Sequence, residues 1–102
     1  MANVFKNYTS ASVGASATTT YTVPSATTAV VIGLNLANTT ASSINVDVQI
    51  AGVYLIKGVL LPANAALSVL DGKIIAEAAD TVVITSSAGS SCDVLVSVLE
   101  QT

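Results

Sequence analysis

The residue types that usually carry chemistry are scarce in this chain. Its 102 residues include no His, no Trp and no Arg, only three Lys, and a single Cys at position 92. Proton transfer, nucleophilic attack and zinc binding depend mostly on His, Cys and closely placed acids and bases. The Ser residues have no His to activate them, and nothing in the sequence marks one Lys as a base. The composition predicts a protein that is not an enzyme and needs no cofactor.

One group of acidic residues has a spacing that could suit a hard cation. Asp71, Glu77 and Asp80 lie close together in a segment rich in turn residues, and Ca²⁺ takes oxygen ligands from loops. Their spacing matches no known loop signature, however, and Asp before Gly or before a strand is typical of turns. We expect Asp71 and Asp80 to be turn residues, and we expect no metal site.

Cys92 and two Asn residues are the other candidates for chemistry. Cys92 has no disulfide partner and no neighbouring base to favour a thiolate, so we expect a small apolar residue at the start of a strand. Asn7-Tyr8-Thr9 and Asn38-Thr39-Thr40 match the glycosylation pattern. Because the first nine residues do not look like a secretion signal, we expect both matches to be coincidental.

The distribution of charge excludes two classes of partner. The three Lys are spread along the chain and are outnumbered by six acidic residues, for a net charge of −3. Nucleic-acid binding needs clustered positive charge, so we expect no such ligand. The longest apolar stretches, residues 29–34 and 53–61, are too short to cross a bilayer, so we expect no membrane segment. Sparse charge on a hydrophobic chain indicates a surface covered by copies of itself or by a partner.

The periodicity predicts an all-β fold. Val, Ile and Thr make up a third of the chain, and apolar residues recur with a step of two. Residues 44–50 show this most clearly, with Ile44 and Val46 inward and Asn45 outward. A Gly-containing link, Ala51-Gly52, predicts a hairpin to residues 53–61. Further strands are expected around Tyr21 and Val23, at 30–36 with Val30, Ile32, Leu34 and Leu36 on one face, at 65–70, at 81–85 and at 92–99, whereas 75–80 is expected to be a tight connection.

About eight short strands with frequent turns indicate an antiparallel β-sandwich or jelly roll spanning residues 18–102. Residues 9–20 are mostly small and polar with little to bury, and we interpret residues 1–17, which include Phe5 and Tyr8, as an extended N-terminal arm. Phe5 and Tyr8 could dock into a neighbouring molecule, or they could form the first edge strand of the same domain. In the last strand, Leu95 and Leu99 lie opposite the Val residues. That strand is either covered on both sides or buries its second face in an oligomer.

Three segments follow one another in a distinctive order: FKNYTSASVG, TTYTVPSATTAVVIGLNLANTTASSINVDVQI and LPANAALSVLDGKIIAEAADTVVITSSAGSSCDVLVSVLE. In this order the chain resembles small virion structural proteins of tailed bacteriophages. In those proteins a strand ending in Val-Pro is followed by an Ala-Asn-Thr-Thr turn, a Pro-led strand, a Gly-Lys turn, an acidic turn before Asp-Thr-Val, and a Val-Leu-Val-Ser-Val-Leu-Glu terminus. The matching positions are Val23, Pro24, 37–40, Pro62, Gly72, Lys73, 80–82 and 94–100.

This resemblance implies a protein that decorates a capsid. Such a protein would bind the major capsid protein or other virion proteins, form a homo-oligomer, with a trimer favoured, and assemble into the virion in the host cytoplasm. The N-terminal arm would bridge neighbouring capsomers. A neck or tail connector and a fibre-associated, receptor-binding module are the alternatives, although loops 39–43 and 86–91 are too small and too poor in aromatic residues to suggest a receptor site.

Overall fold

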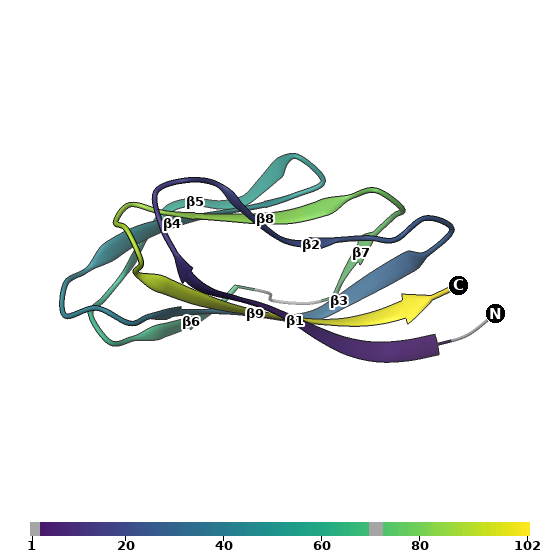
Figure 1. Cartoon of the computed structure of the whole chain (residues 1–102), viewed down its shortest axis with the longest axis horizontal. Helices are drawn as coiled ribbons and strands as arrows, with labels where there is room; N and C mark the ends of the chain where they lie inside the picture. The colour runs from purple at the N-terminus through teal and green to yellow at the C-terminus, as the bar shows by residue number, and fades with distance from the viewer. Residues whose placement is uncertain (1–2, 70–72) are drawn as a thin grey trace.

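The computed structural model describes residues 3–69 and 73–102 and confirms the all-β fold. Two antiparallel sheets pack against each other as a β-sandwich, with both chain ends at the same end of the molecule (Figure 1). The described residues form nine strands, one more than expected: β1 (Asn3–Val13), β2 (Thr18–Thr22), β3 (Thr28–Asn38), β4 (Ile44–Ile50), β5 (Val53–Leu61), β6 (Ala66–Ser68), β7 (Ile74–Ala76), β8 (Thr81–Ser86) and β9 (Cys92–Gln101).

Sheet A contains β1, β9, β3, β6 and β7, with β9 in a central position between β1 and β3. The far side of β3 is shared by two short strands: β6 pairs with residues 35–37 and β7 with residues 29–31. The strand expected at 65–70 is therefore shorter than predicted. The connection expected at 75–80 is partly wrong, because Ile75 and Ala76 belong to β7 and only the residues after them form the turn. Pairing with β3 satisfies backbone groups that a free turn would leave to solvent.

Sheet B has the order β2-β8-β4-β5. The predicted hairpin between β4 and β5 is confirmed, with Ile50 paired to Val53 across a two-residue turn. Both turn residues have positive φ, 54° at Ala51 and 77° at Gly52, which is the conformation that matches the twist of a two-residue hairpin. The β5 strand is one edge of sheet B, and β2 is the other.

The hydrophobic core lies between the two sheets. The predicted alternation of β4 is confirmed, since its four Val and Ile side chains are buried, and so is the inward row of Val94, Val96 and Val98 in β9. The prediction for β3 is wrong in its first half. An irregularity between Val31 and Gly33 turns Val31 inward and leaves Ile32 exposed, because a β-bulge inserts one residue and reverses the alternation.

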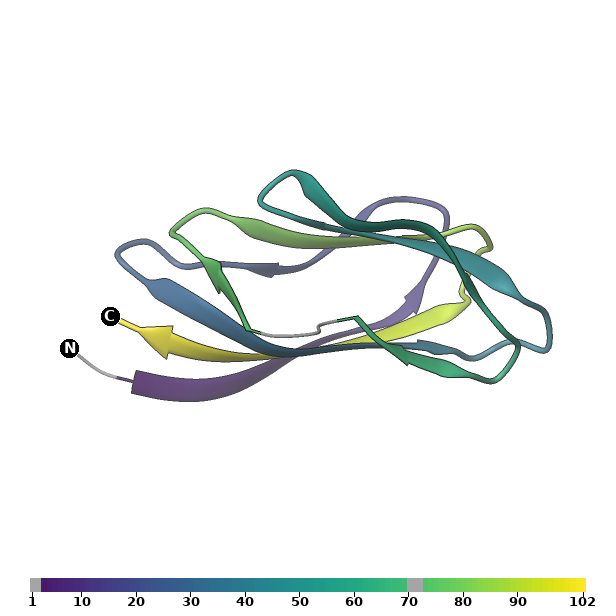
Figure 2. The ribbon, with the colours of Figure 1, turned by 180° about the vertical axis from the view of Figure 1, so that it is seen from behind.

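The N-terminal segment differs from the arm that the sequence suggested. Residues 3–13 form β1, which pairs with β9 from Asn3 opposite Gln101 to Val13 opposite Cys92, so the chain ends run side by side (Figure 2). Of the two alternatives left open by the sequence, the edge strand is the one found. The pairing occupies backbone groups that would otherwise leave β9 as an open edge. Residues 14–17 are the link from β1 to β2, and both of these strands belong to the sandwich.

Candidate functional site

The outer face of sheet A carries a row of apolar side chains that crosses four strands. Phe5 on β1 is paired with Leu99 on β9, Leu99 with Val30 on β3, and Val30 with Ile75 on β7. Directly paired residues place their side chains on the same face of a sheet, about 5 Å apart. The four residues Phe5, Leu99, Val30 and Ile75 therefore form one continuous band, which we call the apolar row.

The ends of the apolar row are open to solvent. Phe5 is 74% exposed and Ile75 is 67% exposed, while Leu99 and Val30 between them are half-buried. A monomeric protein rarely exposes a continuous band of large apolar side chains across one sheet face. Exposing such side chains to water is unfavourable, and burial against a partner removes that free-energy cost. The apolar row is therefore the strongest candidate for a contact surface in the part of the chain that the structure describes.

Uncharged polar residues surround the apolar row. The outward positions next to it on β1, β3 and β9 carry amides and hydroxyls at Asn3, Asn7, Thr28, Ser97 and Gln101, with the exposed Ile32 at the bulge of β3. Farther along the same face lie Thr9, Asn35, Leu95 and the charged Asp93. Ser97 donates a hydrogen bond to the Asn7 side chain over 2.6 Å, which ties β1 to β9 on this face. The surface is also uneven, with a hollow of about 230 Å³ beside Phe5 and Ile32 and another of about 310 Å³ beside Leu95. These hollows could receive the side chains of a partner.

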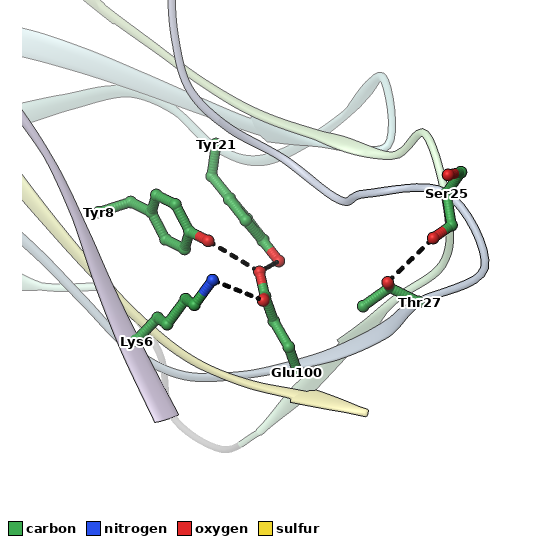
Figure 3. A network of polar contacts seen from close by, with 6 residues as sticks. All are labelled: Lys6, Tyr8, Tyr21, Ser25, Thr27 and Glu100. Carbon is green, nitrogen blue, oxygen red and sulfur yellow. Dashed lines mark hydrogen bonds and ion pairs between the residues drawn. The ribbon is translucent and has the colours of Figure 1, made fainter. Parts of the chain in front are cut away.

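Behind the apolar row, a buried carboxylate joins the two sheets. Glu100 on β9 is only 5% exposed. Its Oε2 accepts hydrogen bonds from the hydroxyls of Tyr21 (2.6 Å) and Tyr8 (2.8 Å), and its Oε1 lies 3.5 Å from the Lys6 ammonium (Figure 3). The two Tyr rings also pack on each other, with centroids 4.3 Å apart. We call these four residues the Glu100 cluster.

The electrostatics of the Glu100 cluster keep its carboxylate ionised. Hydrogen bonds from Tyr21 and then Tyr8, with the charge of Lys6, hold the pKa of Glu100 below its ordinary value although burial acts in the opposite direction. Burial and the bond to Glu100 raise the pKa of Tyr21 and of Tyr8, so both hydroxyls stay protonated and donate. An acceptor held by three donors in this way can position the strands that supply them.

The Glu100 cluster fixes the N-terminal half of β1, where Lys6 and Tyr8 contact Glu100. Lys6 follows Phe5 in the chain and Glu100 follows Leu99, and adjacent strand residues point to opposite faces. The ion pair thus lies on the inner side of the strand pair that presents Phe5 and Leu99. Sequence reasoning missed this cluster. A Glu at an inward position of the last strand, in step with Val94, Val96 and Val98, was the signal that could have revealed it.

Exposed apolar side chains also lie along β5, the edge strand of sheet B in the opposite layer of the sandwich. They are Val53, Tyr54, Leu55 and Leu60. Tyr54 and Leu60 pair with the outward Gln49 and Asn45, whereas Val53 pairs with the inward Ile50, so the four share this strand rather than one sheet face. Its centre carries charge, because the Lys57 ammonium lies 4.5 Å from the centre of the Tyr54 ring and 4.0 Å from Asp47. Asp47 also accepts a hydrogen bond from the Gly58 N–H (2.6 Å) at an irregular point in the β4–β5 pairing. We call the four residues the β5 patch.

The structure also places the site residues named from the sequence. Leu95 and Leu99 lie on the outer face of sheet A, as predicted. Phe5 is exposed on the same face, whereas Tyr8 points inward and is committed to Glu100. The two aromatic residues expected to act together are therefore separated: Phe5 is available to a partner, and Tyr8 stabilises its own domain.

The other candidates for chemistry named from the sequence are Cys92, Asp71, Glu77 and Asp80. Cys92 is fully buried at the first position of β9, as predicted, and burial raises the pKa of its thiol. Asp80 is confirmed as a turn residue, because its carboxylate accepts a hydrogen bond from the Glu77 N–H (2.9 Å) just before β8. Asp71 lies outside the described residues. Within residues 3–69 and 73–102, no three His, Cys, Asp or Glu side chains gather where they could hold a metal ion.

Asn38, the acceptor of one glycosylation match, is a buried turn anchor. Its Nδ2 donates to the carbonyls of Ser42 (2.8 Å), Pro62 (3.1 Å) and Leu61 (3.2 Å). Its Oδ1 accepts from the backbone N–H and the hydroxyl of Thr40. The nitrogen that a sugar would modify is therefore enclosed among three carbonyls, which agrees with the expectation that this match is coincidental.

Neither a scan against protein-family models nor a search of curated proteins finds a match. In the described part of the chain there is also no helix that is long and apolar enough to span a membrane.

Proposed function

We propose that this chain is a non-enzymatic structural protein of a tailed-bacteriophage virion, which binds the outside of the capsid as a decoration protein. The proposal starts from the resemblance of the sequence to such proteins. One structural observation supports it most: the sandwich leaves large apolar side chains uncovered in two places, the apolar row on sheet A and the β5 patch along the edge of sheet B. A protein that links its neighbours needs two separate contact surfaces.

Attachment in many copies would stabilise the capsid shell. Each bound copy contributes its own binding free energy to the assembled state and none to the dissociated state, so hundreds of weak contacts stabilise a shell together. The rigid strand pair β1–β9, held by the Glu100 cluster, would carry the contact, in place of a flexible arm. The homotrimer that the resemblance implies stays a prediction, as do the major capsid protein as partner and assembly in the host cytoplasm.

Counting copies on the particle tests the proposal. Quantitative mass spectrometry of purified virions, in the phage that encodes this chain, should find it in hundreds of copies, and particles lacking it should release their DNA at a lower temperature. Tens of copies or fewer would instead place the chain at the neck, the tail or a fibre. Absence from the virion would overturn the proposal altogether.

A further inference from the structure

We infer that the outer face of sheet A binds a second copy of this chain, with the apolar row as the main hydrophobic part of the contact. The inference deepens the proposed function, on which it rests in part, by assigning one of the two uncovered surfaces to contacts between copies. The β5 patch then remains available to another protein.

The size of the face is sufficient for a stable contact. The molecule measures 45 × 21 × 20 Å along its principal axes, and sheet A forms one of the broad sides. Stable protein interfaces bury roughly 800 Å² on each partner, so such a contact would extend from the apolar row along most of this face. The apolar row provides the main hydrophobic area of the contact, and the neighbouring amides and hydroxyls form a polar rim beside it.

The chemistry of the rim favours a second copy over a partner of opposite charge. Asn and Gln side chains both donate and accept hydrogen bonds, and so do Ser and Thr hydroxyls. A rim made of such groups can pair with an identical rim. A rim of Lys or of acidic residues would instead require a complementary partner, since like charges repel. Each copy carries a net charge of −3, but the apolar row and the rim residues next to it carry none. Asp93, the acidic residue on this face, lies toward the other end of β9, where it accepts a hydrogen bond from the Ser12 N–H.

The edge of β5 is less suited to pairing with its own copy. Lys57 is the middle residue of that strand, so antiparallel pairing of two β5 strands about their centres would bring two Lys57 side chains together. Gly58, with φ of 64°, and the irregular β4–β5 pairing also distort this edge. Bulges and edge Lys residues are features that prevent pairing between sheet edges. Of the two apolar surfaces, the outer face of sheet A is therefore the one assigned to a second copy.

Light scattering coupled to size exclusion tests the inference on the purified full-length chain at micromolar concentration. The wild-type protein should have a mass above the 10.2 kDa of one chain. The double variant Phe5→Ser/Ile75→Ser should weaken self-association by at least about tenfold, because exposed apolar anchors dominate such contacts. Both side chains are largely exposed, so thermal unfolding of the variant should show that it folds.

Leu60→Ser is the matched control, since Leu60 is 62% exposed on the β5 patch. It should leave the mass unchanged. A wild-type chain that elutes as one copy would overturn the inference, as would an oligomer that survives the double variant or one that is lost with Leu60→Ser. The virion copy number is an independent result. A chain that is monomeric in solution but abundant on the particle would refute this inference and leave the proposed function standing.

Discussion

The Tyr21 hydroxyl donates a 2.6 Å hydrogen bond to the Glu100 carboxylate, and this bond connects sheet B to sheet A. Tyr21 comes from β2 and Glu100 from β9, and both are buried. Lys6 and Tyr8 of β1 meet the same carboxylate, so one side chain links three strands. Glu100 is the one buried charged side chain of the described residues, and its cluster lies directly beneath the surface that we assign to self-association.

Replacing Glu100 by Gln should destabilise the fold by about 2 kcal/mol, because hydrogen bonds to a charged group are worth about 1.5–3 kcal/mol and Gln removes the charge from all three donors. Urea unfolding at neutral pH measures the change. Glu77→Gln is the control, since Glu77 is exposed in the turn before β8 and should change stability by less than about 0.5 kcal/mol. An equal effect of the two variants would show that the cluster contributes nothing.

Acid should remove the contribution of Glu100. Its pKa is lowered in the folded protein, so the stabilisation is fully present above the ordinary carboxyl pKa of about 4.3 and is lost as the pH falls through the lowered value. The difference in unfolding free energy between wild type and Glu100→Gln should therefore be constant from pH 8 to about pH 5 and should shrink below that range. Urea titrations across this range give the curve. A difference that grows in acid would contradict the assignment.

The hairpin between β4 and β5 should respond in opposite ways to two substitutions. Ala51 has φ of 54°, a conformation that disfavours residues with a Cβ, so Ala51→Gly should stabilise the protein or leave it unchanged. Gly52 has φ of 77° with open space around it, so Gly52→Ala should cost about 1 kcal/mol from backbone strain alone. Thermal unfolding of both variants provides the test. A more stable Gly52→Ala protein would show that the turn has a different conformation.

Replacing Asn38 by Ala should be among the most damaging single changes outside the apolar core. It removes a side chain that joins the end of β3 to the carbonyls of Leu61 and Pro62 and leaves these buried acceptors with fewer donors. We expect a loss of about 2–3 kcal/mol in urea unfolding, since each unsatisfied buried group costs about 1–3 kcal/mol. Asn45→Ala is the matched control, because Asn45 is exposed on β4. A loss at Asn45 as large as that at Asn38 would contradict this explanation.

The sequence by itself determined the features that depend on local pattern. The alternation of β4, the hairpin at Ala51 and Gly52, the inward Val row of β9 and the burial of Cys92 were all predicted correctly. Each of these follows from a period of two or from the conformational demands of a two-residue turn. The scarcity of reactive side chains was equally visible, because composition does not depend on the fold.

Only the tertiary structure decided the long-range pairings. The polar N-terminal residues form a strand because β9 offers them an open edge, which no local pattern reveals. Tyr21 and Glu100 lie 79 positions apart in the sequence, so neither residue indicates the other until β2 and β9 face each other. The apolar row arises in the same way. Phe5, Val30, Ile75 and Leu99 come from four separate strands, and only the register of the sheet, which hydrogen bonding between distant segments fixes, places them side by side.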